Sequence, residues 1–272
     1  MARMRAVVFP GQGTAGGEVS GEVAEALGRR DGDGEPPYQL AVFASSVELF
    51  YRLREAGVAP DVVAGHSLGE YAAAHAAGSL GLDDGVRLVA ERDRLMTEAS
   101  EKTPGGMVAV IGADPDEVER VVGEADGVVV AANFNTPRQV VVSGESEALE
   151  VALEGIKGRK VPLRVAGAFH SPLMEGAAAR MEKLLAGVEF AEPELPMVGA
   201  AHGEVLRTGR AIRAALREQM LLPVRWSAVM GRFFEMGVDA IFEAGEDGTL
   251  TRMLRDFKRK DVRGMAAKEA LA

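Results

Sequence analysis

The segment Val62-Val63-Ala64-Gly65-His66-Ser67-Leu68-Gly69 decides the fold, because an apolar run leads there into a serine flanked by glycines. The apolar run predicts a buried strand, and the alanine-rich stretch that follows predicts a helix to about residue 77. A G-x-S-x-G pattern between a strand and a helix is typical of a nucleophile elbow, whose tight turn exposes the serine hydroxyl. The Leu68 N–H would then lie at a helix N-terminus, where it can stabilise an oxyanion. In the alternative interpretation, Ser67 only caps the helix.

Composition and charge narrow the class of protein. The chain has 272 residues, 47% of them hydrophobic, which predicts a globular protein with one large domain or one that carries a smaller second domain. The lack of cysteine excludes disulfides, thiolate catalysis and cysteine-bound metal clusters. A net charge of −10 argues against nucleic acid as the main partner. No apolar run fits a membrane span or a signal peptide, so we expect a cytoplasmic protein that binds no membrane.

The residues before and after the serine segment continue an alternation of strands and helices. The run Ala6-Val7-Val8-Phe9 predicts a strand that ends in a proline-glycine turn. Apolar residues at helical spacing predict helices over 38–55 and 83–100. The glycine-rich, acidic residues 14–37 hold a weak helical pattern around 21–27 and a loop over 31–37.

The middle of the chain has a periodicity of its own. Its pattern is strand-helix-strand-strand-helix-strand, the order of ferredoxin-like domains. This predicts a small subdomain over 102–167, inserted into a larger domain formed by 1–101 and 168–272. The expected strands cover 107–111, 128–131, 139–142 and 160–165, and the expected helices cover 114–123 and 146–156, the second with Ser146 as its N-cap.

A serine nucleophile needs a base, and the chain has four histidines. His170 follows the inserted subdomain, where a loop is expected to enter a helix. His66 would point away from Ser67 in a tight turn, His75 lies in the alanine-rich helix, and His202 lies in an expected turn. Elimination favours His170 only modestly, because a single histidine is often structural.

Six motifs in order carry a resemblance that covers nearly the whole chain. They are Phe9-Pro10-Gly11-Gln12-Gly13, Gly65-His66-Ser67-Leu68-Gly69-Glu70-Tyr71, Arg92-Asp93-Arg94-Leu95-Met96, Asn133-Phe134-Asn135-Thr136-Pro137 with Gln139-Val140-Val141-Val142-Ser143-Gly144, Ala168-Phe169-His170-Ser171-Pro172-Leu173-Met174 and Pro223-Val224-Arg225-Trp226. The chain resembles malonyl-CoA:acyl carrier protein transacylases and the acyltransferase domains of polyketide synthases. The resemblance implies an α/β fold, with an α/β-hydrolase-like core and an inserted ferredoxin-like subdomain.

The resemblance also implies the roles of individual residues. Ser67 matches the acylated nucleophile and His170 the general base, with the main-chain carbonyl of Gln219 orienting the histidine. Gln12 and Leu68 match the N–H donors of the oxyanion hole.

Three further residues match the substrate-binding positions of the family. Arg92 matches the arginine that binds the free carboxylate of a malonyl group, which suits a guanidinium fork. Phe169 and Asn135 match the other two positions. Without the resemblance, Arg92 would be interpreted as a solvated charge on a helix.

The activity implied is transfer of a malonyl group from malonyl-CoA to the phosphopantetheine thiol of an acyl carrier protein. Serine-ester chemistry of this kind implies no metal or redox cofactor, and we expect a monomer. One alternative is a hydrolase that clears acyl groups from carrier proteins. The other is a non-catalytic interaction module, because the segment between Gln12 and Tyr38 is shorter than in the family.

Two late features bear on the carrier protein. Gly245-Glu246-Asp247-Gly248 replaces the family's Gly-Pro-Gly turn and adds two acidic groups. Residues 252–263 are rich in basic side chains, which form either a solvated helix face or a docking site for an acidic carrier protein.

Overall fold

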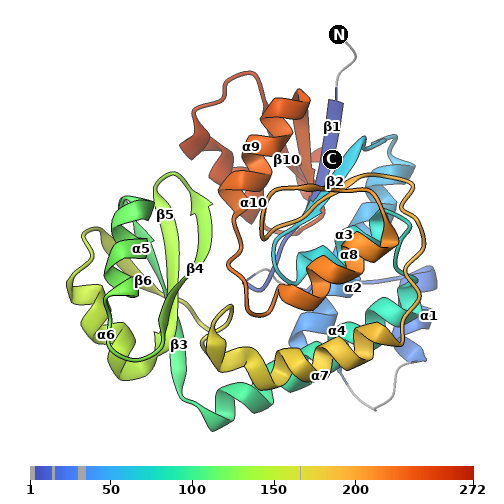
Figure 1. Ribbon diagram of the computed structural model, residues 1–272. Helices are drawn as coiled ribbons and strands as arrows, with labels where there is room; N and C mark the ends of the chain where they lie inside the picture. The colour runs from blue at the N-terminus through green and yellow to red at the C-terminus, as the bar shows by residue number, and fades with distance from the viewer. Residues whose placement is uncertain (1–3, 14–15, 30–34, 166) are drawn as a thin grey trace.

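The computed structural model of the protein describes residues 4–13, 16–29, 35–165 and 167–272. These residues form two separate sheets (Figure 1). The larger sheet has the strand order β10-β9-β1-β2-β7-β8. Neighbouring strands of this sheet are parallel except for β7 and β8. Its strands are β1 (Met4–Phe9), β2 (Val62–Gly65), β7 (Met197–Val198), β8 (Val205–Leu206), β9 (Val238–Glu243) and β10 (Arg263–Ala266).

Helices cover both faces of the larger sheet, because its central strands are apolar on both sides. In β1, Val7 and Phe9 pack into one core cluster, whereas Ala6 and Val8 pack into another. The first cluster includes residues of α1 (Gly21–Gly28), α2 (Tyr38–Glu55), α3 (Gly69–Ala76), α4 (Leu82–Lys102), α7 (Glu175–Ala186), α8 (Gly209–Glu218) and α11 (Ala267–Ala270). The second includes residues of α9 (Trp226–Met236), α10 (Thr249–Met253) and the 3₁₀ turn η2 (Leu254–Phe257).

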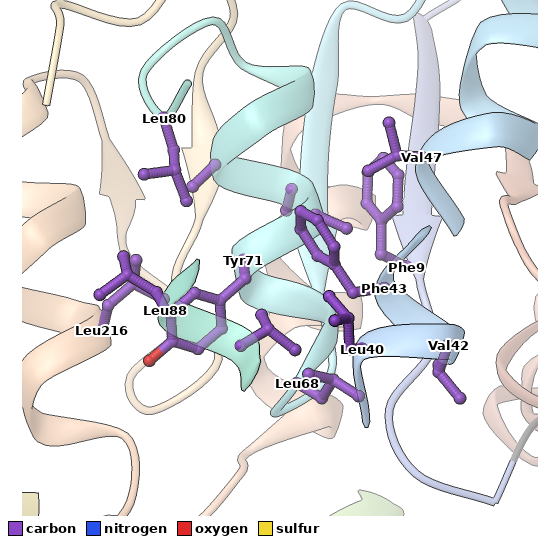
Figure 2. Packing of buried hydrophobic residues seen from close by; sticks show 14 of the residues in the cluster. Phe9, Leu40, Val42, Phe43, Val47, Leu68, Tyr71, Leu80, Leu88 and Leu216 are labelled. Carbon is purple, nitrogen blue, oxygen red and sulfur yellow. The ribbon is translucent and has the colours of Figure 1, made fainter. Parts of the chain in front are cut away.

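The first of these clusters holds the turn after β2 firmly in place. Figure 2 shows Leu68 beside Leu40 and below Phe43, whereas the ring of Tyr71 points the other way and lies beside Leu88. All five are at most 1% exposed. Burial of such side chains stabilises the fold by about 1.5–3 kcal/mol each, so the turn between β2 and α3 is anchored on both sides.

The smaller sheet has the order β4-β5-β3-β6 with antiparallel neighbours throughout. This is the arrangement of a ferredoxin-like unit, so the predicted α/β fold with a small inserted subdomain is confirmed. The boundaries assigned to the two domains stay predictions. The elements are β3 (Gly105–Ile111), α5 (Pro115–Gly123), β4 (Val129–Thr136), β5 (Gln139–Glu145), α6 (Ser146–Glu154) and β6 (Arg159–Pro162).

Side-chain alternation gives the smaller sheet two different faces. Val108 and Val110 of β3 pack with residues of α5 and α6. Met107, Ala109 and Ile111 point the other way and line a cavity shared with the larger domain. The inserted unit therefore forms one wall of that cavity.

Several elements differ from their predicted bounds. Strand β4 runs to Thr136, and β6 ends at Pro162, where it was expected to run to 165. Ser146 is the first residue of α6 and not its cap, since Glu145 holds the N-cap position without a side-chain hydrogen bond. The helix expected after His170 begins as the 3₁₀ turn η1 (Pro172–Met174) before α7.

The basic stretch 252–263 is not a single helix face. It crosses the end of α10, the turn η2 and the start of β10. Arg252 donates to the Asp247 carbonyl and Arg259 pairs with Asp261. Carrier docking on this stretch stays a prediction. The loop expected over 31–37 lies largely outside the described residues.

Candidate active site

The turn between β2 and α3 has the backbone geometry predicted for an elbow. Ser67 has a φ of 52°, in the left-handed region that non-glycine residues rarely adopt. A Cβ on Gly69 would lie 2.1 Å from the Phe9 carbonyl oxygen, and one on Gly65 would lie 2.0 Å from the Gly69 carbonyl carbon. Glycine at position 69 therefore lets the turn pack directly on the end of β1, and glycine at position 65 lets the turn close tightly on the start of α3.

His170 lies in hydrogen-bonding contact with the serine, although the sequence separates them by 103 positions. Its Nε2 lies 2.7 Å from Ser67 Oγ. Its Nδ1 lies 2.8 Å from the Gln219 carbonyl oxygen and 3.0 Å from that of Leu222. Two carbonyl acceptors require a proton on Nδ1, which leaves Nε2 free to accept the serine proton.

The backbone at His170, like that at Ser67, has a conformation that non-glycine residues rarely adopt. The described residues include three non-glycine positions with positive φ, and two of them are Ser67 and His170. Ser171 is fully buried and donates its hydroxyl to the Ala168 carbonyl at 2.6 Å. Strained residues held by such contacts are frequent where side chains must be pre-organised.

The histidine is neutral over a wide pH range. Burial, followed by the positive charge of Arg92, lowers the pKa of His170 to about 4. The Gln219 carbonyl acts in the opposite direction but more weakly. A neutral imidazole next to a hydroxyl can act as a general base.

Arg92 lies behind the serine and not on the cavity wall. Its side chain in α4 has no exposed surface. Nη2 donates to Ser67 Oγ at 3.1 Å, Nε donates to Gln219 Oε1 at 3.2 Å, and Nη1 donates to Gln39 Oε1. None of the ion pairs found within the described ranges includes this guanidinium. Arg92 is therefore a buried cation with neutral partners.

Two residues that hold this arrangement were not predicted from the sequence. Gln39 of α2 accepts from Arg92, as described above. Glu70 of α3 accepts from the Ala200 N–H and from Gln219 Nε2, both at 3.0 Å. Both side chains are at most 2% exposed. The only sequence signal available was a polar residue at a core-facing position of each helix.

Gln219 therefore supports the site with its side-chain amide as well as with its main-chain carbonyl. The amide links the Arg92 guanidinium to the Glu70 carboxyl, and it also lies 3.3 Å from the Ser67 carbonyl oxygen. The predicted contact between the Gln219 main-chain carbonyl and His170 is present.

The two residues predicted for the oxyanion hole lie beside the serine. Gln12 follows β1 and lines the same cavity as Ser67. Leu68 precedes α3, and none of the backbone hydrogen bonds found among the described residues uses its N–H. N–H groups at a helix N-terminus lack intrahelical partners and are suited to binding an oxyanion.

The cavity has a volume of about 380 Å³ and lies between the two domains. Phe169 and Asn135, both predicted to contact substrate, are part of its wall. Asn135 Oδ1 lies 2.9 Å from His66 Nε2, and Asn135 Nδ2 donates to Gln139 Oε1 at 2.9 Å. The wall is formed by Pro10, Gly11, Gln12, Gly13, His66, Ser67, Met107, Ala109, Ile111, Asn133, Asn135, Gln139, Val141, Val161, Leu163, Val165, Phe169, His170, Thr249, Leu250 and Met253.

The other histidines have separate environments. His66 is held by Asn135 and packs near Trp226, with 5.7 Å between the ring centroids. His75 lies 2.7 Å from the Tyr51 hydroxyl and 2.9 Å from the Leu80 carbonyl oxygen, which is a structural role. His202 is exposed. Within the part of the chain that the structure describes, His170 is the one histidine that hydrogen bonds to Ser67.

Within the described ranges, none of the helices has the length and apolar character needed to span a membrane.

Comparisons with known proteins agree with this geometry. A sequence model of the acyl transferase domain family matches residues 35–270. The malonyl CoA-acyl carrier protein transacylase of Bacillus subtilis (strain 168) is 33% identical over 229 residues, which are 82% of this chain and 72% of the relative.

Solved structures show the same similarity over almost the full chain. The malonyl-CoA:ACP transacylase of Synechocystis sp. PCC 6803 has a TM-score of 0.87 and 30% identity, with 97% of both chains covered. A malonyl-transacylase in complex with a type II PKS acyl-carrier protein has a TM-score of 0.87 and 32% identity, with 98% of this chain and 97% of that chain covered.

Proposed function

Since this chain belongs to the acyl transferase family, we propose that it transfers a malonyl group from malonyl-CoA to the thiol of an acyl carrier protein. The observation that carries the proposal is the contact of 2.7 Å between Ser67 Oγ and His170 Nε2, with Nδ1 held by the Gln219 carbonyl. A nucleophile, a base and an element that orients the base are the parts that covalent acyl transfer requires.

The reaction proceeds in two half-reactions. Ser67 Oγ bonds to the thioester carbon while its proton passes to His170 Nε2. The carbon–sulfur bond breaks, and coenzyme A leaves as a thiol with that proton. The carrier thiol then gives its proton to His170 Nε2, and its sulfur bonds to the ester carbon. The bond between that carbon and Ser67 Oγ breaks, and His170 returns the proton to Ser67 Oγ. The N–H groups of Gln12 and Leu68 bind the oxyanion in both steps.

Intact mass after incubation with malonyl-CoA tests this proposal. We expect a mass increase of one malonyl group that disappears when a phosphopantetheinylated carrier protein is added. An adduct that decays equally fast without any thiol would indicate the hydrolase alternative. A chain that gains no mass would be a non-catalytic module.

Arg92→Ala is expected to invert the preference between malonyl-CoA and acetyl-CoA. The malonyl carboxylate would lose its buried cationic partner, at a cost of about 2–5 kcal/mol. Acetyl-CoA has no carboxylate and escapes this loss. The measurement is a competition between the two thioesters, with each acyl-enzyme quantified by mass.

The matched control is Arg92→Lys, which keeps a positive charge but not the planar fork. It should retain part of the preference for malonyl. Equal losses for both thioesters in Arg92→Ala would show that Arg92 supports the fold and does not bind the carboxylate.

Phe169 is expected to exclude branched substrates. Its ring is 5% exposed, lines the cavity and directly precedes His170. We expect the chain to use malonyl-CoA over methylmalonyl-CoA by roughly 10–200-fold, the range for one added methyl group in a tight pocket. Phe169→Leu and Phe169→Ala should reduce this ratio in steps. Equal use of both thioesters by the unmodified chain would refute the role of Phe169.

The chemistry proposed here needs no metal or redox cofactor, since the thioester is already activated. The partners are malonyl-CoA and an acyl carrier protein. A monomeric state and a cytoplasmic location stay predictions from the sequence.

A further inference from the structure

The position of Arg92 is unexpected for a group that binds substrate. Its guanidinium has no exposed surface and takes no part in the cavity wall. Nε and Nη1 already donate to Gln219 and Gln39, and Nη2 donates to Ser67 Oγ. A substrate carboxylate that reaches Nη2 from the cavity would therefore compete with Ser67 Oγ for this group.

The same oxygen is the acceptor for Arg92 and the partner of His170. Ser67 Oγ lies 3.1 Å from Arg92 Nη2 and 2.7 Å from His170 Nε2. Whatever changes the Arg92 contact also changes the surroundings of the nucleophile and its base.

We propose that the carboxylate of a diacid thioester switches on the Ser67–His170 pair by drawing Arg92 Nη2 away from Ser67 Oγ and neutralising its charge. This inference rests on the proposed function. In addition to binding the carboxylate, Arg92 would then control the rate of Ser67 acylation. A thioester without a carboxylate leaves the guanidinium in contact with Ser67 Oγ and keeps this rate low.

The electrostatic reason lies in the acylation step. When the Ser67 proton reaches His170, an imidazolium forms next to the Arg92 guanidinium. Two cations around one oxygen in a buried site repel each other with little screening by water. Arg92 is also the second cause, after burial, of the lowered pKa of His170. A bound carboxylate cancels this contribution, so the histidine becomes a stronger base when a diacid is present.

Other titratable groups near His170 do not provide this control. His66 faces it from the elbow and lowers its pKa slightly. Glu70 of α3 is linked to it only through Gln219, and burial raises the pKa of Glu70 to about 8. Glu70 therefore changes its charge near pH 8, whereas His170 becomes protonated only near pH 4.

The test is the pH dependence of a single acylation turnover, measured on the unmodified chain with saturating malonyl-CoA and with saturating acetyl-CoA. Rates at saturation report groups in the substrate complex. Acylation needs neutral His170, so each rate falls as the pH drops through its pKa. Each profile should have a constant maximum, the plateau, and a fall at low pH, the acid limb. We expect the acid limb for acetyl-CoA to lie at lower pH than that for malonyl-CoA, and the acetyl plateau to be lower. Acid limbs at the same pH for the two thioesters would overturn the inference.

A pair of variants tests the charge directly. Arg92→Gln removes the cation and keeps an amide that can hydrogen bond, whereas Arg92→Lys keeps the cation. With acetyl-CoA, Arg92→Gln should move the acid limb to higher pH and raise the plateau by roughly three- to tenfold, following the dependence of general-base catalysis on basicity. Arg92→Lys should keep the acid limb of the unmodified chain. A lower acetyl plateau in Arg92→Gln, with folded circular dichroism, would also overturn the inference.

The proposed function and the proposed switch would fail in different ways. If no malonyl adduct forms on the unmodified chain at any pH, the proposed function is wrong. If the adduct forms but the two thioesters give the same acid limb, the function stands and the switch is wrong. The comparison of thioesters needs no variant, so it decides even if Arg92→Gln does not fold.

Discussion

Replacement of Ser67 by alanine is expected to abolish acyl-enzyme formation and to leave the fold intact. The substitution removes the one oxygen that contacts both His170 Nε2 and Arg92 Nη2. It keeps the Cβ that the backbone already accommodates at a φ of 52°. The lost hydrogen bonds, one of them to a buried cation, should lower the free energy of unfolding by about 1–3 kcal/mol, which a fold of this size tolerates.

Intact mass after incubation with malonyl-CoA measures the effect, and thermal unfolding checks the fold. Ser79→Ala is the matched control, because the Ser79 hydroxyl is buried and donates to the Ala191 carbonyl outside the site. The control should gain one malonyl group like the unmodified chain. A stable adduct on Ser67→Ala would show that another group is the nucleophile.

The hydrophobic pattern predicted the bounds of a helix or strand well where its buried side chains are apolar. Helix α2 has the predicted bounds, 38–55, because apolar spacing fills it and Pro37 and Gly57 flank it. Strand β4 was predicted too short. Its second half contains Asn133, Asn135 and Thr136, which are at most 6% exposed, and the Phe134 N–H donates to the Val224 carbonyl of the other domain. A hydrophobic pattern cannot identify polar strand residues whose hydrogen-bond partners lie far away in the sequence.

In the site, too, features formed by contiguous residues were predictable, whereas contacts between residues far apart in the sequence were not. Ser67 was predictable, because its strand, turn and helix are contiguous. The contacts of Arg92 were not, since Gln39 lies 53 positions away and Gln219 lies 127 positions away. The family resemblance predicted a cation for the substrate carboxylate, but only the structure places that cation behind the nucleophile.

Replacement of His170 by alanine is expected to slow malonyl transfer by roughly two to four orders of magnitude, the usual cost of losing a positioned general base. Ser67 would then have to give its proton to water. The Gln219 and Leu222 carbonyls would lose their shared donor, which should cost about 1–3 kcal/mol of stability if they stay buried. Transfer rates are therefore compared at a temperature at which both proteins are folded.

Two measurements separate loss of the base from general damage. His202→Ala changes an exposed histidine and should keep the full rate. Added imidazole should restore part of the rate of His170→Ala, because a free base can occupy the space left beside Ser67. Near-normal transfer in His170→Ala would move the role to His66, which also lines the cavity but is held by Asn135. In that event His66→Ala would show the loss predicted here for His170, because the serine ester still cannot form unless a neighbouring group accepts the proton.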